Sequence, residues 1–187
     1  MSMFDLRKAK ETPETKSLVF RYLDFDQKTG TFTWKISAKN KAGAGKVAGT
    51  LHKSGYRTIK IKRVNYQCSR LAWLFKTGEW PKNHIDHINN DKTDNRIENL
   101  REATHSQNGC NRPMAPYNTS GFKGVSWMSK ARRYKAQITA DGKTYSLGMF
   151  DDPGMAYEAY KKAAQELHGE FYHVDPSATA ALNEQAE

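Results

Sequence analysis

The chain has 187 residues, with 30 Lys and Arg against 20 Asp and Glu, which gives a formal net charge of +10. Its isoelectric point near 9.5 and mean hydropathy of -0.84 argue against a membrane span and predict a polyanion as the partner. Cys68 and Cys110 form no CxxC pair, which argues against a disulfide scaffold or a cysteine zinc site. No signal or transit segment follows the charged start, so we expect a cytoplasmic protein.

The positive charge is concentrated in two stretches of the chain. Residues 35–78 carry eleven Lys and Arg and no acid, and residues 103–140 carry six and no acid. A solvated surface without a function normally mixes both signs. The two stretches therefore predict two surfaces that contact phosphate groups.

The first half of the chain is expected to be rich in β structure. Residues 1–16 lack apolar periodicity and predict a mobile tail, and structure is expected from Ser17, with a short helix from Leu18. The stretch GTFTWKI alternates apolar and polar residues as a half-buried strand does. Residues 56–66 alternate in the same way and predict a twisted ribbon with one basic face. The stretch SRLAWLFKTG predicts an amphipathic helix that ends at Gly78.

The second half predicts a small sheet and one helix after a linker at 113–120, where prolines interrupt every periodicity. The stretches GFKGVSW, YKAQIT and KTYSLGMF are expected to be strands, and Asp141–Gly142 suits a tight hairpin between the last two. A helix follows, capped by Asp151 or Asp152 and closed by Gly169. Its expected apolar stripe consists of Ala156, Ala159, Tyr160, Ala163, Ala164 and Leu167. We expect it to cover the sheet face that carries Tyr134, Ala136 and Ile138, and residues 175–187 to form a tail.

The stretch NHIDHINNDKTDNRIENLREATHSQN concentrates histidines, acids and asparagines. A long polar loop would explain its composition, because asparagine favours turns. Asp86 and His87 are adjacent, so on a strand they serve one site only if the backbone bends there. Thr104 suits a helix N-cap, which would place His105 and Asn108 one turn apart. The stretch therefore predicts the order strand, loop, strand, helix.

The motifs DH, NLR and ATHSQN of this stretch resemble the His-Asn-His (HNH) family of ββα-metal endonucleases, in the subgroup of phage and homing enzymes whose last histidine is replaced by asparagine. This resemblance covers about residues 18–112. Residues 121–173, with GFKGVSW, YKAQI, LGMFD, AYEAY and HGEF, resemble the Apetala/ethylene-response-factor (ERF) DNA-binding domain.

The two resemblances imply an α+β protein of two domains. A nuclease region at 17–112, with its catalytic core at about 81–112 and a β-rich N-terminal extension, would precede an ERF-type domain at 121–174. The ERF-type domain implies a three-stranded antiparallel sheet packed on one helix.

The nuclease resemblance also implies a role for each motif residue. His87 would be the general base, Asp86 and Asn108 the metal ligands, and Asn99 the residue that orients the bent loop and His87. One carboxylate and one amide suit Mg²⁺ or Mn²⁺ better than zinc. Cleavage would leave 5′-phosphate and 3′-hydroxyl ends. The expected partner is double-stranded DNA, with no membrane, no small-molecule cofactor and an open oligomeric state.

The basic blocks and the sheet supply the candidate DNA contacts. The candidates are Lys60, Lys62, Arg63, Arg112, Lys123, Trp127, Arg132, Arg133, Lys135 and Lys143.

Two alternatives remain at the level of the sequence. One is a DNA-binding regulator without catalytic activity on a nuclease-like fold. The other is a structural zinc site made by His84, Asp86, His87 and His105.

Overall fold

A computed structural model describes residues 10–36, 43–115 and 117–172. The predicted tail at 175–187 and the first nine residues of the predicted tail at 1–16 lie outside these residues. The chain divides into two compact units, Met1–Glu102 and Ala103–Glu187. The boundary lies before the linker predicted at 113–120, because the short helix that precedes the linker packs within the second unit.

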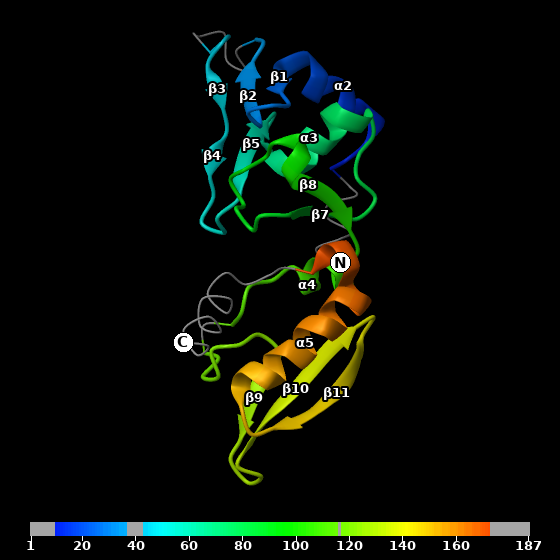
Figure 1. Ribbon diagram of the computed structural model, residues 1–187. Helices are drawn as coiled ribbons and strands as arrows, with labels where there is room; N and C mark the ends of the chain where they lie inside the picture. The colour runs from blue at the N-terminus through cyan, green and yellow to red at the C-terminus, as the bar shows by residue number, and fades with distance from the viewer. Residues whose placement is uncertain (1–9, 37–42, 116, 173–187) are drawn as a thin grey trace. The chain divides into compact units, whose positions relative to one another are not determined.

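In its described residues, the first unit is built from short strands and two α-helices of similar length (Figure 1). Its elements are α2 (Pro13–Tyr22), β1 (Leu23–Asp26), β2 (Thr31–Trp34), β3 (Val47–Ala48), β4 (Thr50–Leu51), β5 (Arg57–Ile61), β6 (Val64–Gln67), α3 (Cys68–Thr77), β7 (His84–His87), the 3₁₀ helix η1 (Ile97–Asn99) and β8 (Leu100–Ala103). Their sheets have the strand orders β1-β2-β3, β4-β5-β6 and β7-β8.

Helix α2 starts earlier than the sequence predicted. The Thr12 hydroxyl accepts a hydrogen bond from the Thr15 backbone N–H, and the Thr15 side chain accepts one from the Thr12 backbone N–H. This capping box, with Pro13 in the first turn, starts the helix inside the predicted tail. The prediction that structure begins near Ser17 was therefore wrong for the residues from Pro13 onward.

The predicted ribbon is the β5–β6 hairpin, which pairs antiparallel. Ile59 and Ile61 are buried, while Lys60 is exposed, as the alternation predicted. Lys62 and Arg63 form the turn itself, since both have positive φ angles (44° and 70°). Both therefore lie at the tip of the hairpin, so Lys62 is not on the basic face where the alternation predicted it.

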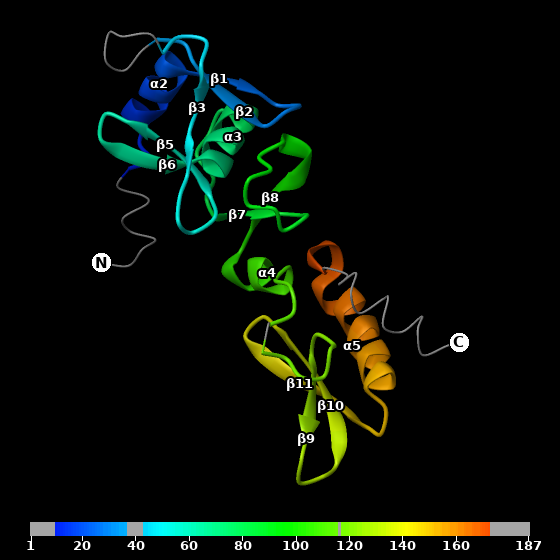
Figure 2. The ribbon, with the colours of Figure 1, turned by 90° about the vertical axis from the view of Figure 1, so that its left-hand side faces the viewer.

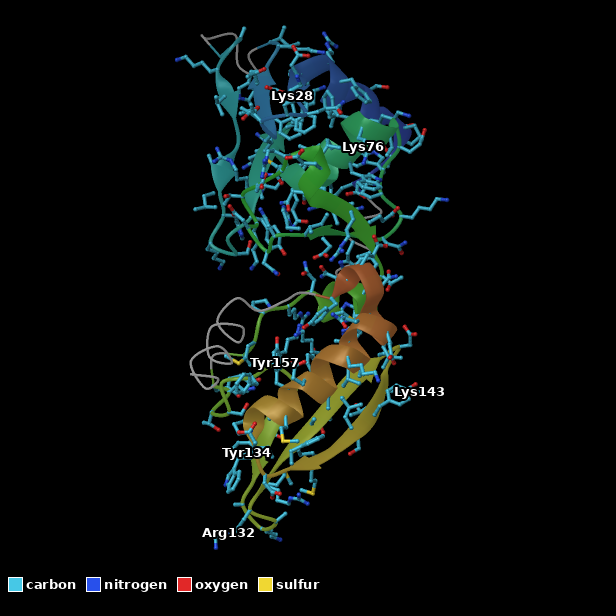
Figure 3. All side chains as sticks on the ribbon, viewed as in Figure 1. Lys28, Lys76, Arg132, Tyr134, Lys143 and Tyr157 are labelled. Atoms are coloured by element: carbon cyan, nitrogen blue, oxygen red, sulfur yellow. The ribbon has the colours of Figure 1, made fainter. Side chains whose placement is uncertain are left out.

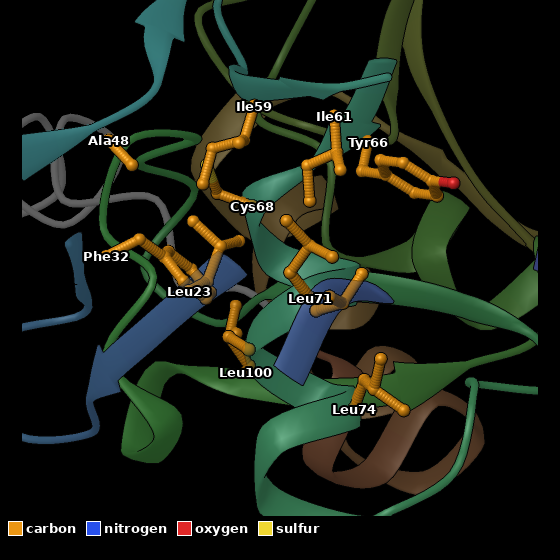
Figure 4. Close-up of a cluster of buried hydrophobic side chains, with 12 residues drawn as sticks. Leu23, Phe32, Ala48, Ile59, Ile61, Tyr66, Cys68, Leu71, Leu74 and Leu100 are labelled. Atoms are coloured by element: carbon orange, nitrogen blue, oxygen red, sulfur yellow. The ribbon is translucent and has the colours of Figure 1, made fainter. Parts of the chain in front are cut away.

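One apolar core holds the first unit together (Figure 4). Leu23, Ile59 and Leu71 are fully buried in it and come from β1, β5 and α3. Leu100, the first residue of β8, belongs to the same cluster. Because Leu100 follows Asn99 directly, the core fixes the backbone of the motif NLR next to the candidate site.

The second unit contains α4 (His105–Cys110), β9 (Val125–Met128), β10 (Arg133–Ala140), β11 (Lys143–Phe150), α5 (Pro153–His168) and the 3₁₀ helix η2 (Gly169–Phe171). The strands form one antiparallel sheet with β10 in the middle. Figure 2 shows that α5 lies along one face of this sheet. The described structure therefore has the predicted three strands and one helix.

The sequence predicted the hairpin turn and the helix cap of the second unit correctly, but it did not predict every residue of the apolar stripe of α5 correctly. Asp141 and Gly142 have positive φ angles (48° and 75°) in the β10–β11 hairpin, and Asp152 caps α5 through the Met155 N–H. Leu167 is 47% exposed, so its place in the predicted apolar stripe was wrong. The buried face is rotated instead toward Tyr157, which packs on the sheet with Ala156, Tyr160, Ala163 and Ala164.

Within the described residues, no helix combines the length and the apolar character that crossing a membrane requires.

Candidate active site

The candidate site begins at the end of β7. Asp86 and His87 are both buried, with exposed fractions of 5% and 4%. The chain turns directly after His87, where the Asn90 N–H donates to the His87 carbonyl at 2.9 Å and Asn90 adopts a φ of 62°. The chain therefore bends directly after these two residues.

The His87 imidazole is held by Asn95. Its Nε2 lies 3.3 Å from the Asn95 Oδ1, and the Asn95 Nδ2 donates to the Thr93 carbonyl at 3.0 Å. The second bond fixes the orientation of the amide, so its oxygen faces the imidazole. An oxygen partner requires a proton on Nε2 in the neutral ring, which assigns the lone pair to Nδ1.

Burial lowers the pKa of His87, because desolvation disfavours the charged imidazole. The hydrogen bond to Asn95 and the charges of Asp86, Asp91 and Asp94 act in the opposite direction and are smaller. The histidine is therefore held neutral, which is the form that accepts a proton.

Asp86 is paired with Arg101 of β8. The Asp86 Oδ2 accepts a hydrogen bond from the Arg101 Nε at 2.9 Å and forms an ion pair with the Arg101 Nη2, also at 2.9 Å. Both side chains are largely buried. The guanidinium thus balances a carboxylate that would otherwise be costly to bury.

Asn99 ties the loop after His87 to the start of β8. Its Oδ1 accepts from the Asn89 N–H at 3.0 Å, and its Nδ2 donates to the Asn89 Oδ1 and to the Asp94 carbonyl, each at 2.9 Å. The Ile88 N–H donates to the Asn99 carbonyl at 2.9 Å. Asn99 therefore shapes the loop, while the contact with the His87 ring comes from Asn95.

The loop is further stiffened by its own charges. Arg96 donates to both Asp94 oxygens, at 2.9 and 2.7 Å, and these bonds lower the pKa of Asp94 to about 2. The Ile97 N–H donates to the Gln27 carbonyl of the β1–β2 turn at 3.3 Å. The N-terminal hairpin therefore supports the loop that carries Asn95.

A buried arginine fixes the chain on the other side of β7. Arg70 of α3 pairs with Glu11 and donates to the carbonyls of Pro81 and Asn83, at 2.9 and 2.7 Å. Its side chain is 9% exposed. The segment that enters β7 is therefore anchored to the core helix.

Asn108 and His105 lie on α4, in the second unit. Thr104 caps this helix as predicted, in a reciprocal pair of hydrogen bonds with Gln107. The order β7, loop, β8, α4 is also the order that the sequence predicted. Asp86, His87 and Asn99 are thus brought together in the first unit, and Asn108 is placed on the helix that follows.

The candidate DNA contacts occupy several different surfaces. Lys60, Lys62 and Arg63 are exposed on the β5–β6 hairpin, and Arg112 is exposed after α4. The Lys123 Nζ donates to the carbonyls of Cys110 and Arg112, at 2.8 and 2.6 Å. Its ammonium therefore stabilises the C-terminal end of α4, which differs from the phosphate contact that the sequence predicted.

The strand register separates the remaining candidates. Lys135 pairs with Ser126, whereas Trp127 pairs with Tyr134 on the face that α5 covers, with ring centroids 4.8 Å apart. Trp127 therefore does not share a face with Lys135. Arg132 lies in the β9–β10 turn and Lys143 starts β11 at the opposite end of the sheet (Figure 3). Of the predicted sheet contacts, Arg133 and Lys135 share the open face.

The zinc alternative finds no support in the described part of the chain, where no three His, Cys, Asp or Glu side chains form a metal-binding group. The predicted Mg²⁺ or Mn²⁺ site has one carboxylate and one amide, so it would not form such a group of three.

Sequence reasoning missed Asn95, Arg101, Tyr56 and Lys92. Arg101 stands in the motif NLR, and its position on β8 was the available signal for a partner of Asp86. Tyr56 lies with its ring centroid 5.8 Å from that of His87, and Lys92 lies over the Tyr56 ring. These contacts join residues from separate elements, and the spacing of residues in the sequence does not reveal contacts of that kind.

Known proteins resemble this chain across most of its length. Residues 66–110, from β6 to the end of α4, match the HNH endonuclease family. Protein 3.8 of Escherichia phage T7 is 33% identical over 122 residues, which is 65% of this chain and 97% of that protein. An uncharacterized HNH endonuclease of Acanthamoeba polyphaga mimivirus is 32% identical over 144 residues, which is 76% of this chain and 73% of that protein. No solved structure matches the chain significantly.

Proposed function

The chain belongs to the HNH endonuclease family, and on that basis we propose that it is a metal-dependent endonuclease that hydrolyses phosphodiester bonds in double-stranded DNA. The observation that carries this proposal is His87, which is buried, has a pKa lowered by that burial, and is oriented by Asn95 beside the carboxylate of its neighbour Asp86. A phage-genome or homing role is part of this proposal, and one relative is a protein of phage T7.

His87 acts as the general base. Its Nδ1 accepts a proton from a water molecule while the water oxygen attacks phosphorus and the bond from phosphorus to the 3′ oxygen breaks. The 3′ oxygen then takes up a proton, so the products are a 5′-phosphate and a 3′-hydroxyl. Asn95 keeps the proton on Nε2, and Asn99 holds the loop that positions Asn95.

Mg²⁺ or Mn²⁺ suits the chemistry of the two proposed ligands. Asp86 provides a buried carboxylate and Asn108 an amide oxygen, and hard oxygen ligands suit these ions. When bound, the cation would stabilise the negative charge on the phosphate and on the leaving oxygen. Arg101 keeps the Asp86 carboxylate oriented.

The second unit serves as the DNA anchor in this proposal. Its three strands and one helix support an ERF-type domain, and the face opposite α5 exposes Arg133, Gln137 and Thr139 beside the partly exposed Lys135. Arg133 is paired with Asp151 at 2.8 Å, so Lys135 provides the charge for a phosphate, while Gln137 and Thr139 offer hydrogen bonds.

Supercoiled plasmid tests the proposal. The unaltered protein should produce open-circular or linear DNA with Mg²⁺ and neither with EDTA. His87→Ala should slow the reaction by on the order of 10²–10⁴-fold while keeping DNA affinity, because a general base contributes to rate and little to ground-state binding. Binding without cleavage by the unaltered protein would favour the non-catalytic regulator, and tightly retained zinc would favour the structural zinc site.

A further inference from the structure

We propose that Lys92 binds a backbone phosphate of the DNA next to the bond that is cut. The proposal rests on the nuclease function above and adds a substrate contact to the same site. Lys92 lies in the loop between His87 and Asn99, and its side chain is exposed.

Tyr56 connects Lys92 with His87. The Lys92 Nζ lies 5.0 Å from the centroid of the Tyr56 ring, and that ring lies 5.8 Å from the imidazole of His87. The Nζ also donates to the Ser54 carbonyl at 3.3 Å. Two contacts thus hold an exposed lysine close to the general base, although its charge remains open to solvent.

The turn before β5 is shaped to receive this lysine. The Gly55 N–H donates to the His52 carbonyl at 2.8 Å, and Gly55 has a φ of +85°. A Cβ at Gly55 would lie 3.3 Å from the Lys92 Cδ, so a side chain there would crowd the lysine stem. The glycine therefore permits the close approach of the lysine to Tyr56.

The charges around His87 distinguish Lys92 from its cationic neighbours. Arg101 is paired with Asp86, and Arg96 is paired with Asp94. Lys92 contacts a carbonyl and a ring face, and it forms no ion pair with any described residue. Its positive charge is therefore not neutralised by a carboxylate of the protein. A lysine in a loop with several carboxylates must be unpaired in this way if it is to bind a phosphate.

A lysine that only packs on an aromatic ring provides the matched control. Lys76 lies over the Trp73 ring at 5.2 Å, at the end of α3, and is exposed like Lys92. Both lysines make the same kind of ring contact, but the ring under Lys92 is the one that contacts His87. Substituting each by glutamine therefore separates a phosphate contact from ring packing.

The test measures affinity for duplex DNA in EDTA across a salt series, and plasmid cleavage in Mg²⁺. Lys92→Gln should reduce the slope of log affinity against log salt by about 0.9, the value for one lost phosphate contact. It should also slow cleavage by on the order of 10-fold or more, because a charged group near the reacting phosphate is lost. Lys92→Arg should retain most of both properties, and Lys76→Gln should change neither.

Each outcome decides a different claim. If Lys92→Gln and Lys76→Gln behave alike while the unaltered protein cuts DNA, the proposal for Lys92 is wrong and the nuclease function stands. If the unaltered protein does not cut but Lys92→Gln alone reduces the salt slope, the phosphate contact stands and the nuclease function fails. Absence of any DNA binding by the unaltered protein would overturn both.

Discussion

Replacing Gly30 by alanine should displace the loop that carries Asn95 and, through that loop, disturb the candidate active site. Gly30 closes the β1–β2 turn with a φ of +69°, and its N–H donates to the Asp26 carbonyl at 2.9 Å. A Cβ at this position would lie 2.5 Å from the Arg96 nitrogen and 2.6 Å from the Asn95 carbonyl carbon. Both are backbone atoms, so the hairpin and the loop must separate to admit the methyl group.

Two free-energy costs lower the stability of Gly30→Ala, and the same substitution at a second glycine distinguishes them. An L-residue in the left-handed region costs roughly 1–2 kcal/mol. The forced contact adds about 1–3 kcal/mol, as insertion of extra atoms into a packed interior does. Gly78 has a φ of +76°, and a methyl group added there would meet no described atom within 4 Å, so Gly78→Ala carries the first cost alone.

Thermal unfolding followed by circular dichroism measures the difference. Gly30→Ala should be less stable than Gly78→Ala by about 1–3 kcal/mol, and each kcal/mol corresponds to a shift of about 4–8 °C in Tm for a unit of this size. Cleavage should fall further in Gly30→Ala, since Asn95 would move away from His87. Equal changes in Tm and in cleavage for the two variants would refute the argument that the hairpin supports the loop.

Two further predictions concern buried groups of the first unit. Burial raises the pKa of Cys68 to about 12, so a thiol reagent at pH 8 should label one cysteine of the folded chain, Cys110, and both after unfolding; labelling of both in the folded chain would contradict the burial. Arg70→Met should lower the free energy of unfolding by about 3–5 kcal/mol, because it leaves the Glu11 carboxylate buried without its partner. Denaturant titration measures this loss, and a change below about 1 kcal/mol, as for an exposed pair, would show that the pair is unimportant.

Sequence patterns predicted the elements whose signals are local. Gly78 ends α3 in the left-handed conformation, Thr104 caps α4, and the Asp141–Gly142 pair turns the last hairpin. Each signal depends on the backbone preference of one or two residues, so it survives in any tertiary context.

Expectations that depended on packing were less accurate. Leu167 fits the predicted stripe of α5, but it is 47% exposed, whereas the next residue, His168, is buried with its Nε2 3.1 Å from the Thr139 carbonyl of β10. Leu167 therefore lies off the helix face that packs on the sheet, and Tyr157 lies on it. The tail prediction overlooked the capping box of Thr12 and Thr15 because residues 1–16 show no apolar periodicity. Helix starts marked by side-chain hydrogen bonds need no such periodicity.

The same distinction applies to the candidate site. The motifs DH and NLR made Asp86, His87 and Asn99 candidates through their resemblance to the HNH family. Asn95 as the partner of the His87 ring and Arg101 as the partner of Asp86 follow from how the loop and β8 fold back on β7. Sequence spacing provides candidates for a site, whereas hydrogen-bond partners depend on the tertiary fold.

Lys123 offers a direct test between the sequence-based prediction and the structure. The sequence predicts a DNA contact, whereas the structure places its ammonium on two carbonyls at the end of α4, the helix that carries Asn108. Lys123→Met should therefore loosen α4 and, if Asn108 is the metal ligand proposed above, raise the Mg²⁺ concentration needed for half-maximal cleavage, because a ligand on a frayed helix is held less firmly. Lys130→Met, at an exposed turn position of the same unit, provides the control and should leave the Mg²⁺ requirement unchanged. If Lys123→Met instead reduces the salt slope of DNA binding by about 0.9 and leaves the Mg²⁺ requirement unchanged, its role is the phosphate contact that the sequence predicted.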